Sequence, residues 1–415
     1  MNVFVIGGGG REDALIWKLK QSPRVGKIFC APGNAGIAAR VETVDIAVGD
    51  VGALLQFAKS ARIDLTVVGP EQPLSLGIVD AFEAAGMRIF GPRAAAAQIE
   101  ASKAFSKRLM KKYGIPTADA EVLPLDEVRR RLSSLSFPIV LKVDGLASGK
   151  GVVIAQDAAE AACALAMFES FGAAAGQIVV EQYLTGAEVS FFVLTDGETV
   201  IPLTSAEDHK QIFDGDRGPN TGGMGAISPS PRLTPALQAD VMARIARPTI
   251  AALAAEGAPY CGVLYLGLML TADGSFVLEY NARFGDPEAQ AILVRLETDL
   301  VDLIDAALDR RLDTTTIRWR DDISVCVVLA AAGYPALPRT GDAISGLDQV
   351  GDSDIAVFHA GTTMQDGRCV TSGGRVLGVT AWGPSVDAAR RRAYATVDRL
   401  HFDGRQYRRD IGLRR

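Results

Sequence analysis

One segment of the chain reads Phe276-Val-Leu-Glu-Tyr-Asn-Ala-Arg-Phe-Gly-Asp-Pro-Glu288 and runs from an apolar strand directly into a polar turn. Side chains alternate between the two faces of a strand, so Glu279 and Asn281 are expected on the same face. A carboxylate and an amide oxygen side by side are hard oxygen ligands that suit Mg²⁺ shared with nucleotide phosphates. Arg283 follows, with a planar fork that fits a carboxylate or a phosphate. The segment therefore predicts a metal and anion site at the end of a strand.

A second segment, residues 137–154, predicts two strands joined by a glycine-rich loop. It reads Phe137-Pro-Ile-Val-Leu-Lys-Val-Asp-Gly-Leu-Ala-Ser-Gly-Lys-Gly-Val-Val-Ile154, with Lys142 at the end of the first apolar run and Lys150 in the loop. The loop is not a P-loop, because Lys150 is not followed by Ser or Thr and the loop leads into a strand. A plain β-hairpin with a lysine at its tip is the alternative to a flexible phosphate cover. The cover is favoured because three glycines free the backbone N–H groups to face an anion: Gly145, Gly149 and Gly151.

Length, charge and cysteine usage agree with a soluble enzyme and decide little more. The 415 residues are enough for two or three domains with their own cores. A net charge of −6 argues against nucleic acid or a membrane surface as the main partner. The five cysteines show no C-x-x-C pairing, which predicts free thiols in a reducing cytoplasm. The apolar run at residues 3–6 is too short for a signal peptide or a membrane span.

The first hundred residues alternate between strand and helix patterns, which predicts a parallel sheet. The expected strands are residues 3–6, 27–31, 65–69 and 88–90, and the expected helices are residues 11–21, 51–60 and 78–85. A ligand of such a sheet binds beyond the carboxyl ends of the strands. Three loops fall at those ends and are expected to line one cleft: residues 7–10, 33–36 and 69–71.

The register of the pattern changes near residue 102. Ser102 is a plausible N-cap for a helix over residues 102–113, which Gly114 ends. Further along, Asp273-Gly274 predicts a hairpin that joins strands at 263–270 and 275–280. The last region is expected to hold strands at 324–330, 355–360 and 375–381 and a helix at 387–400. The predicted domains are a parallel α/β unit, an α+β unit containing a small mobile subdomain and a β-rich unit, over residues 1–101, 102–320 (subdomain about 118–188) and 321–415.

A dinucleotide-binding dehydrogenase is the tempting alternative for the N-terminus. The fingerprint G-x-G-x-x-G, started at Gly7, requires glycine where Glu12 stands, and a carboxylate there would repel a pyrophosphate. The second strand also ends in Ala31-Pro-Gly33, without the acid that would hold a ribose diol. NAD binding is therefore not expected.

In their order along the chain these motifs resemble the ATP-grasp superfamily, in which two α+β lobes clamp ATP beneath a glycine-rich hairpin. Within it, the chain is similar throughout its length to the glycinamide ribonucleotide synthetase family. The motifs that carry this resemblance are Gly7–Glu12, Ala31–Gly36, Val68–Glu71, Ser102–Phe105, Asp208–Lys210, Pro219–Gly225, Asn281–Glu288 and Ala332–Pro335. The resemblance implies an N-terminal parallel α/β domain, a two-lobed ATP-grasp domain and a C-terminal β-rich domain.

The resemblance also implies an activity. The expected reaction joins glycine to 5-phosphoribosylamine through a glycyl phosphate intermediate, with ATP converted to ADP and phosphate, in de novo purine (IMP) biosynthesis. The implied cofactors are ATP and Mg²⁺ or Mn²⁺. The implied protein is cytoplasmic, a monomer or weak homodimer, and binds small molecules but neither nucleic acid nor membrane.

Individual roles follow from matching the family's motifs to this sequence. The implied ATP-binding residues are Lys103, Lys142, Gly145, Gly149, Lys150, Gly151, Glu181, Tyr183, Leu184 and Glu188, and the implied metal ligands are Glu279 and Asn281. The implied substrate-binding residues are Gly9, Gly10, Arg11, Glu12, Glu71, His209, Lys210, Asn220, Thr221, Arg283 and Asp286. The implied catalytic residues are Arg283, Lys150 and Asp208. The family commonly has histidine where this chain has Asp13, and no function is assigned to that residue.

Other interpretations remain open at this stage. The nearer one is an ATP-grasp ligase or carboxylase for a different acid, and the remoter one is a non-catalytic nucleotide-binding regulator. A Ser-His-Asp or Cys-His hydrolase is not excluded by composition, but no nucleophile-elbow pattern appears. His359 and His401 show no partner in the sequence, so a packing or surface role is expected for both.

Overall fold

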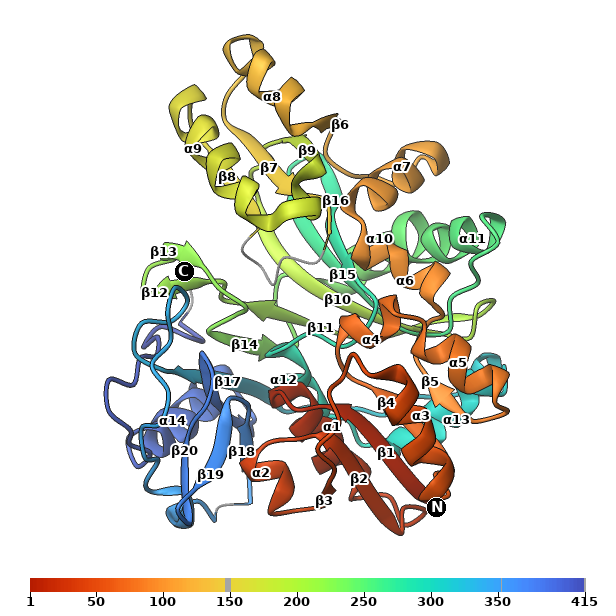
Figure 1. The fold of residues 1–415 in the computed structure, drawn as a ribbon, viewed down its shortest axis with the longest axis vertical. Helices are drawn as coiled ribbons and strands as arrows, with labels where there is room; N and C mark the ends of the chain where they lie inside the picture. Colours follow the sequence, from red (N-terminus) through yellow and green to blue (C-terminus); the bar gives the residue numbers. More distant parts are fainter. Residues whose placement is uncertain (146–150, 352, 414–415) are drawn as a thin grey trace.

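The expected fold class, a parallel α/β unit followed by α+β units, is confirmed. The computed structural model describes residues 1–145, 151–351 and 353–413. Figure 1 shows the parallel sheet at the N-terminus, a small lobe of residues 118–182 that projects at the top, and a large sheet that runs between the lobe and the C-terminal region. No helix within the described ranges is long and apolar enough to cross a membrane.

The N-terminal sheet has the order β3-β2-β1-β4-β5 with every neighbouring pair parallel. Phe4 and Ile6 pack into one apolar cluster and Val3 and Val5 into another, because helices cover both faces of the sheet. Its strands are β1 Asn2–Gly7, β2 Lys27–Pro32, β3 Glu42–Thr43, β4 Leu65–Val68 and β5 Ile89–Phe90. Its helices are α1 Gly10–Leu19, α2 Ala35–Ala38, α3 Val51–Ser60, α4 Glu71–Ser75, α5 Ile78–Ala84 and α6 Ala94–Ala101.

The small lobe has an antiparallel sheet of its own, in the order β6-β9-β7-β8. Helix α7 (Lys103–Tyr113) leads to it, with Ser102 as the N-cap and Gly114 at a φ of 66° as the C-cap, as the sequence predicts. A separate apolar cluster fills the lobe, which makes it a packing unit distinct from the large sheet. Its elements are β6 Ala120–Pro124, α8 Leu125–Arg131, η1 Leu132–Ser134, β7 Ile139–Val143, β8 Val152–Ala155, α9 Ala158–Phe168, η2 Glu169–Gly176 and β9 Gln177–Gln182.

The large sheet is antiparallel throughout, in the order β16-β15-β10-β11-β14-β17-β21-β18. Strand β14 pairs with β17, so the sheet continues from the strands near the lobe into the C-terminal region. The elements before that region are β10 Ala187–Thr195, β11 Val200–Asp208, β12 Gln211–Phe213, β13 Arg217–Asn220, β14 Gly225–Ser228, α10 Pro235–Val241, η3 Met242–Ala246, α11 Arg247–Ala255, β15 Gly262–Thr271, β16 Gly274–Asn281, α12 Glu288–Leu293, α13 Leu300–Leu308 and η4 Leu312–Thr314. Those of the C-terminal region are β17 Ile323–Ala330, η5 Leu347–Gln349, β18 Ile355–His359, β19 Thr362–Gln365, β20 Arg368–Thr371, β21 Arg375–Gly383 and α14 Val386–Val397.

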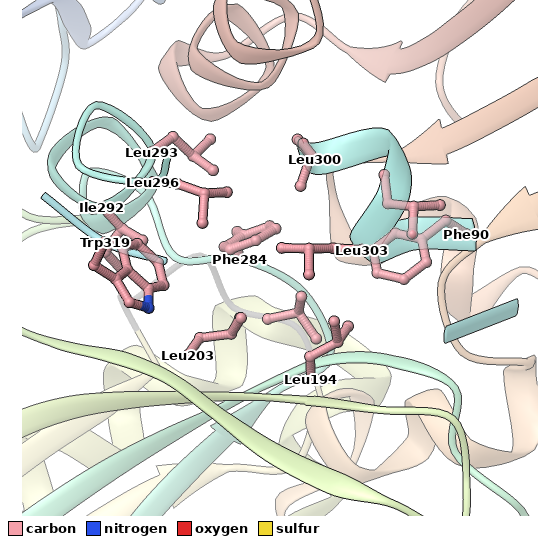
Figure 2. A pocket seen from close by; sticks show the side chains of 12 residues that line it. Phe90, Leu194, Leu203, Phe284, Ile292, Leu293, Leu296, Leu300, Leu303 and Trp319 are labelled. Atoms are coloured by element: carbon pink, nitrogen blue, oxygen red, sulfur yellow. The ribbon is translucent and has the colours of Figure 1, made fainter. Parts of the chain in front are cut away.

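The chain that follows β16 rests on an apolar core. Figure 2 shows the ring of Phe284 in the middle of side chains from α12, α13 and the strands below. They enclose a cavity of only about 10 Å³, so the packing around the ring is nearly complete. Phe284 therefore anchors the turn, and the residue before it, Arg283, belongs to the polar site.

Candidate active site

A buried glutamate between two lysines joins the small lobe to the rest of the protein. The Lys142 ammonium on β7 lies 2.9 Å from Oε2 of Glu181 on β9, and it donates a 2.9 Å hydrogen bond to the carbonyl of Leu278. The Lys107 ammonium on α7 lies 3.2 Å from Oε1 of Glu181, an oxygen that accepts no well-aligned hydrogen bond. Burial lowers the pKa of Lys107 to about 8, with Glu181 opposing the shift. Glu181 is 2 % exposed, so it is not an ordinary surface acid.

The start of α7 holds the start of the glycine-rich loop. Lys103 Nζ donates a 2.9 Å hydrogen bond to the carbonyl of Gly145. Ser102 Oγ and the backbone N–H of Ala104 donate to Oδ1 of Asp144, at 3.0 and 3.1 Å. Burial lowers the pKa of Lys103, which faces Lys142 as well as Glu279.

The other end of the loop closes on β7. The N–H of Val143 donates a 2.9 Å hydrogen bond to the carbonyl of Gly151, so β7 and β8 are joined as the sequence predicts. Gly149 and Lys150 lie outside the described residues. Tyr183 and Leu184 lie in the connection from β9 to β10, between the small lobe and the large sheet.

A lysine lies between two carboxylates at the end of β16. Lys210 Nζ is 3.1 Å from Oε2 of Glu188 and 3.6 Å from Oε1 of Glu279. The Glu188 carboxylate holds the pKa of Lys210 well above its usual value, with Glu279 adding to the effect and burial opposing it. Although burial acts in the opposite direction, the ammonium groups of Lys210, Lys142 and Lys103 keep the pKa of Glu279 below its usual value. Glu279 is therefore an ionised carboxylate surrounded by cations.

Strict side-chain alternation along β16 is interrupted just before Glu279. Gly267 of β15 pairs with Glu279, but the next residue, Leu268, pairs with Val277, so Leu278 forms a bulge. Glu279 and Asn281 stay two residues apart beyond the bulge, and the carbonyl of Leu278 is free to accept from Lys142. The bulge is not visible in the sequence pattern, because it arises from pairing with β15.

The donor set at Glu279 fits a magnesium ion that is shared with phosphates. A carboxylate and an amide oxygen supply two hard ligands, and Mg²⁺ in nucleotide sites completes its shell with phosphate oxygens and water. Within the described ranges, no group of three His, Cys, Asp or Glu side chains could hold a metal without such help. The residues therefore fit the metal only together with a nucleotide.

A second acid, the half-buried Asp208 at the end of β11, faces the turn after β16. Its Oδ1 atom is buried without a hydrogen-bond partner. Burial, reinforced by the neighbouring charge of Glu288, holds the pKa of Asp208 well above its usual value. Glu288 is 3 % exposed, and its Oε1 accepts a 3.1 Å hydrogen bond from Ser190 Oγ. An unpartnered buried carboxyl oxygen is costly in a protein, so its presence points to a functional role.

Arg283 is held by two acids from the N-terminal half of the chain. Its Nη2 donates a 2.7 Å hydrogen bond to Oε1 of Glu100, and its Nη1 donates to the carbonyl of Phe284 at 3.1 Å. Its Nε lies 3.3 Å from Oε2 of Glu71 but has no aligned acceptor. Because a guanidinium has five N–H donors, Arg283 keeps spare donors for a ligand. Arg11 approaches the same place and donates to the Phe284 carbonyl at 3.2 Å.

The three loops at the ends of β1, β2 and β4 lie together, as predicted. The N–H of Gly33 donates to the carbonyl of Gly7 at 3.2 Å. Glu12 fills the space against Gly69, accepts a 2.6 Å hydrogen bond from the N–H of Gly9, and pairs with Arg11 at 2.6 Å. A side chain at Gly69 would collide with Glu12, which explains glycine there.

The turn at Asp286 reaches the first of these loops. A Cβ atom on Gly9 would lie 3.2 Å from Oδ2 of Asp286, and one on Gly10 would lie 2.4 Å from Nε2 of Gln290. Gln290 donates a 2.8 Å hydrogen bond to Oδ1 of Asp286. The N-terminal sheet and the turn after β16 are thus brought into contact, although they are almost 280 residues apart in sequence.

Two further predicted residues hold the backbone of the acceptor loop, a name used here for residues 219–225. Thr221 donates both its N–H and its hydroxyl to the carbonyl of Lys210, each at 2.8 Å. The N–H of Met224 donates to the carbonyl of His209 at 2.8 Å, and burial lowers the pKa of the His209 ring. Asn220 lies at the end of β13, where it pairs with Gln211.

Several residues of this region were not predicted from the sequence. Glu288 closes the segment quoted first, so its place in the motif was a usable signal. Lys107, Glu100 and Arg375 belong to no local motif, and only the fold brings them to the site. Arg375 of β21 donates to the backbone carbonyls of both Gly222 and Asp286.

The packing role expected for His359 is confirmed, because its side chain is 8 % exposed, and the structure also gives this residue two partners. Its ring Nδ1 lies 3.1 Å from Oγ1 of Thr362, and its backbone N–H donates a 2.7 Å hydrogen bond to Oδ2 of Asp13. Arg40 donates to Oδ1 of the same carboxylate at 2.5 Å. Asp13, the residue that departs from the family pattern, therefore joins the N-terminal sheet to β18. The contact was not predictable because it joins residues 346 positions apart.

Taken together, Lys142 of the small antiparallel lobe bonds to β16 of the large antiparallel sheet, beside Glu279, and Lys103 and Lys210 lie near the same carboxylate. This arrangement defines an ATP-grasp protein. Models of the phosphoribosylglycinamide synthetase family match the chain in three consecutive parts: the N domain over residues 1–100, the ATP-grasp (A) domain over residues 101–289 and the C domain over residues 324–414.

Relatives support the same assignment over the whole chain. A phosphoribosylamine–glycine ligase of Vibrio vulnificus (strain YJ016) is 50% identical over 421 residues, covering 100% of this chain and 98% of that protein. The ligase of the same name from Mesorhizobium japonicum is 48% identical over 415 residues, covering 99% and 98%. The chain belongs to the phosphoribosylglycinamide synthetase family, as the resemblance of its motifs indicated.

Solved structures agree with this fold. The crystal structure of a phosphoribosylamine–glycine ligase from Thermotoga maritima superposes with a TM-score of 0.85 at 33% identity, covering 99% of this chain and all of that one. A biotin carboxylase domain of Hydrogenobacter thermophilus 2-oxoglutarate carboxylase, in complex with MgADP, gives a TM-score of 0.75 at 18% identity over 98% of this chain. The latter likeness concerns the fold alone.

Proposed function

We propose that the chain ligates glycine to 5-phosphoribosylamine, converting ATP to ADP and phosphate and producing glycinamide ribonucleotide for purine biosynthesis. The observation that carries the proposal is the ionised Glu279 surrounded by the ammonium groups of Lys103, Lys142 and Lys210. Cations around one carboxylate match a site that binds polyphosphate with a divalent ion. The names of the full-length relatives supply the two other substrates.

In the proposed mechanism, residues of this chain position the reactants and neutralise charge. Lys103 and Lys142 bind phosphate oxygens, and Glu279 with Asn281 holds Mg²⁺ or Mn²⁺, which offsets the charge on those oxygens when it is bound. Arg283 uses its spare N–H groups to hold the glycine carboxylate in line with the γ-phosphorus. A carboxylate oxygen of glycine bonds to phosphorus while the bond to ADP breaks, which forms glycyl phosphate.

The second step forms the amide. The amine nitrogen of phosphoribosylamine bonds to the acyl carbon of glycyl phosphate, and phosphate leaves with the bonding electrons. We assign Asp208 as the acceptor of the amine proton, because its raised pKa and unpartnered Oδ1 suit a proton acceptor. The loops that carry Gly9, Gly10 and Arg11 are proposed to hold the phosphoribosyl group.

The nucleotide base is assigned to the connection between the two lobes. The poorly satisfied Oε1 of Glu181 is a buried acceptor suited to the adenine amine. Tyr183 and Leu184 offer backbone groups in the same connection, and Glu188 is assigned to the ribose hydroxyls. A cytoplasmic location and a monomer or weak homodimer are part of the same proposal, and the five unpaired cysteines are in keeping with a reducing compartment.

The test is ADP release from Mg²⁺-ATP with glycine, in the presence and absence of phosphoribosylamine generated from ribose 5-phosphate and ammonia. The expected result is release that requires both substrates, with glycinamide ribonucleotide detected by mass spectrometry. Release with another acid or amine, but not with these, would refute the substrate assignment and retain an ATP-grasp ligase. No turnover with any acid would favour a non-catalytic nucleotide binder. Replacing Mg²⁺ with Mn²⁺ in the same assay decides the metal.

A further inference from the structure

Thr221 anchors the start of the acceptor loop through its hydroxyl, but the centre of the loop has no side chain that could hold it in position. Gly222 and Gly223 stand at its centre, and Gly223 has a φ of 110°. A Cβ on Gly223 would lie 2.5 Å from Cδ of Pro287 and 2.6 Å from Oδ1 of Asp208, so a side chain is excluded there. Glycine has the most backbone freedom in a chain, and a loop built from it needs external contacts to stay in one place.

The C-terminal region, defined here as residues 321–413, supplies those contacts. The N–H of Gly222 donates a 3.0 Å hydrogen bond to the hydroxyl of Tyr334. The carbonyl of the same residue accepts from Nη1 of Arg375. Both polar groups of one glycine are therefore held by the C-terminal region.

Arg375 also holds the turn after β16. Its Nη1 donates to the carbonyl of Asp286 at 2.5 Å, and its Nη2 lies 3.4 Å from Oδ2 of the same residue. One guanidinium thus bridges the acceptor loop and the turn that carries Arg283. Its planar fork suits this, because several acceptors are contacted from one rigid group.

The hairpin before the acceptor loop is attached to the C-terminal region as well. Arg408, fully buried, donates to the carbonyl of Gln211 at 3.2 Å and pairs with Asp216 at 2.8 Å. The N–H of Gly215 donates to Oδ2 of Asp410 at 2.9 Å. These contacts fix the entry to the loop, and Tyr334 and Arg375 fix its centre.

We propose that Arg375, together with Tyr334, is a positioning residue that sets the distance between the acceptor loop and the Arg283–Glu288 turn. The C-terminal region then acts on the reaction by placing Asp208 and Arg283 relative to one another, without itself binding the nucleotide. The expected effect of Arg375 on catalysis rests on the proposed function, whereas its expected effect on the rigidity of the two segments does not. It also gives a task to Ala332–Pro335, a segment for which the sequence indicated no role.

The first experiment is hydrogen–deuterium exchange on the full-length protein without ligands. Arg375→Met is expected to accelerate exchange in both residues 219–225 and residues 284–288, because Arg375 contacts both. Tyr334→Phe is expected to accelerate exchange only in the first, because the hydroxyl that it removes accepts a hydrogen bond from Gly222 of that loop. Arg392→Met is the matched control: Arg392 also bonds a backbone carbonyl, that of Trp382, and an acid, Asp354, but at the other end of β21. Wild-type exchange in both loops of Arg375→Met would overturn the proposal.

The second experiment measures steady-state kinetics of the same variants. Arg375→Met is expected to raise the KM of glycine and phosphoribosylamine about 10- to 100-fold, because small displacements of reactants are costly. The KM of ATP should stay within about twofold, and Arg375→Lys should recover part of the loss. An equal rise in the KM of ATP would refute a positioning role confined to the acceptor side.

The two experiments separate failure of this proposal from failure of the proposed function. A wild-type protein that does not use glycine and phosphoribosylamine refutes the function, while exchange in the two loops still decides the role of Arg375. Where Arg375→Met does not fold, Tyr334→Phe decides, since it removes a single hydroxyl. Unchanged exchange at residues 219–225 and unchanged kinetics in Tyr334→Phe would then overturn the proposal.

Discussion

Replacing Glu181 by glutamine tests whether the buried ion cluster holds the small lobe in place. The substitution keeps the shape of the side chain and removes the charge that lies 2.9 Å from Lys142 and 3.2 Å from Lys107. Removing one partner of a buried ion pair typically costs about 3–5 kcal/mol, because the remaining charge is left uncompensated. The loss is limited here because Lys107, with a pKa of about 8, loses its proton readily. We therefore expect the lower end, about 3 kcal/mol.

The effect has a defined pH dependence. Burial lowers the pKa of Lys107 from 10.5 to about 8, so the charged form destabilises the folded protein below pH 8 and Glu181 offsets part of that cost. Without Glu181 the pKa of Lys107 falls further, so the deficit of the variant grows as the pH falls below about 8. Above about pH 8 Lys107 is neutral in both proteins, so the loss of stability in the variant becomes smaller. What remains is the loss of the interaction between Glu181 and Lys142.

Amide exchange of the β7 and β9 backbone is the suitable assay, because it reports the stability of the lobe separately from that of the other regions. A deficit of about 3 kcal/mol corresponds to exchange about 100-fold faster at pH 7. Glu121→Gln is the matched control: Glu121 lies on neighbouring β6, is 58% exposed and pairs with Arg131 at 2.7 Å. It should exchange like wild type, since exposed pairs contribute little. Equal exchange in the two variants, or a deficit that grows with pH, would refute the reasoning.

Three further outcomes are expected. Gly223→Ala should lower the steady-state turnover rate by about 100-fold, because Gly223 has a φ of 110° and a Cβ atom there would lie 2.5 Å from Cδ of Pro287. Gly86→Ala is the control and should leave turnover unchanged, because Gly86 also has a positive φ, 71°, but open space around it. Burial raises the pKa of Asp13 from 3.8 to about 6, so ionising this carboxyl destabilises the folded protein. Between pH 4 and pH 7 the free energy of unfolding of the wild type, measured by denaturant titration, should therefore fall by about 3 kcal/mol relative to that of Asp13→Asn. A difference that does not change with pH would contradict the raised pKa. Ser102→Ala removes the N-cap of α7 and a hydrogen bond to Asp144, so it should lower the free energy of unfolding by about 1 kcal/mol and raise the KM of ATP. An unchanged KM would show that this hydrogen bond does not position the glycine-rich loop for ATP.

Local patterns in the sequence were sufficient for most elements and for the class of site. The run of apolar residues at 3–6 predicted a buried strand, and Ser102 and Gly114 predicted the ends of α7, because capping and burial depend on neighbours in the chain. Glu279 and Asn281 predicted hard ligands, since two-residue spacing on a strand needs no tertiary information. The two strands on either side of the glycine-rich loop were likewise predicted, and the resemblance to a family implied that the loop covers a nucleotide.

Only the tertiary structure decided which residues meet across the site. The bulge at Leu278 depends on pairing with β15, and the placement of Lys107 beside Glu181 depends on how α7 packs against the lobe. The large sheet continues into the C-terminal region and brings β18 and β21 toward the N-terminal sheet. Only for this reason does Asp13 bond His359, and Gly222 bond Arg375. Such contacts leave no periodic trace, since each partner is a single residue outside the local sequence pattern. The sequence by itself thus determined the chemistry available to this protein, and the fold determined the distances at which that chemistry is held.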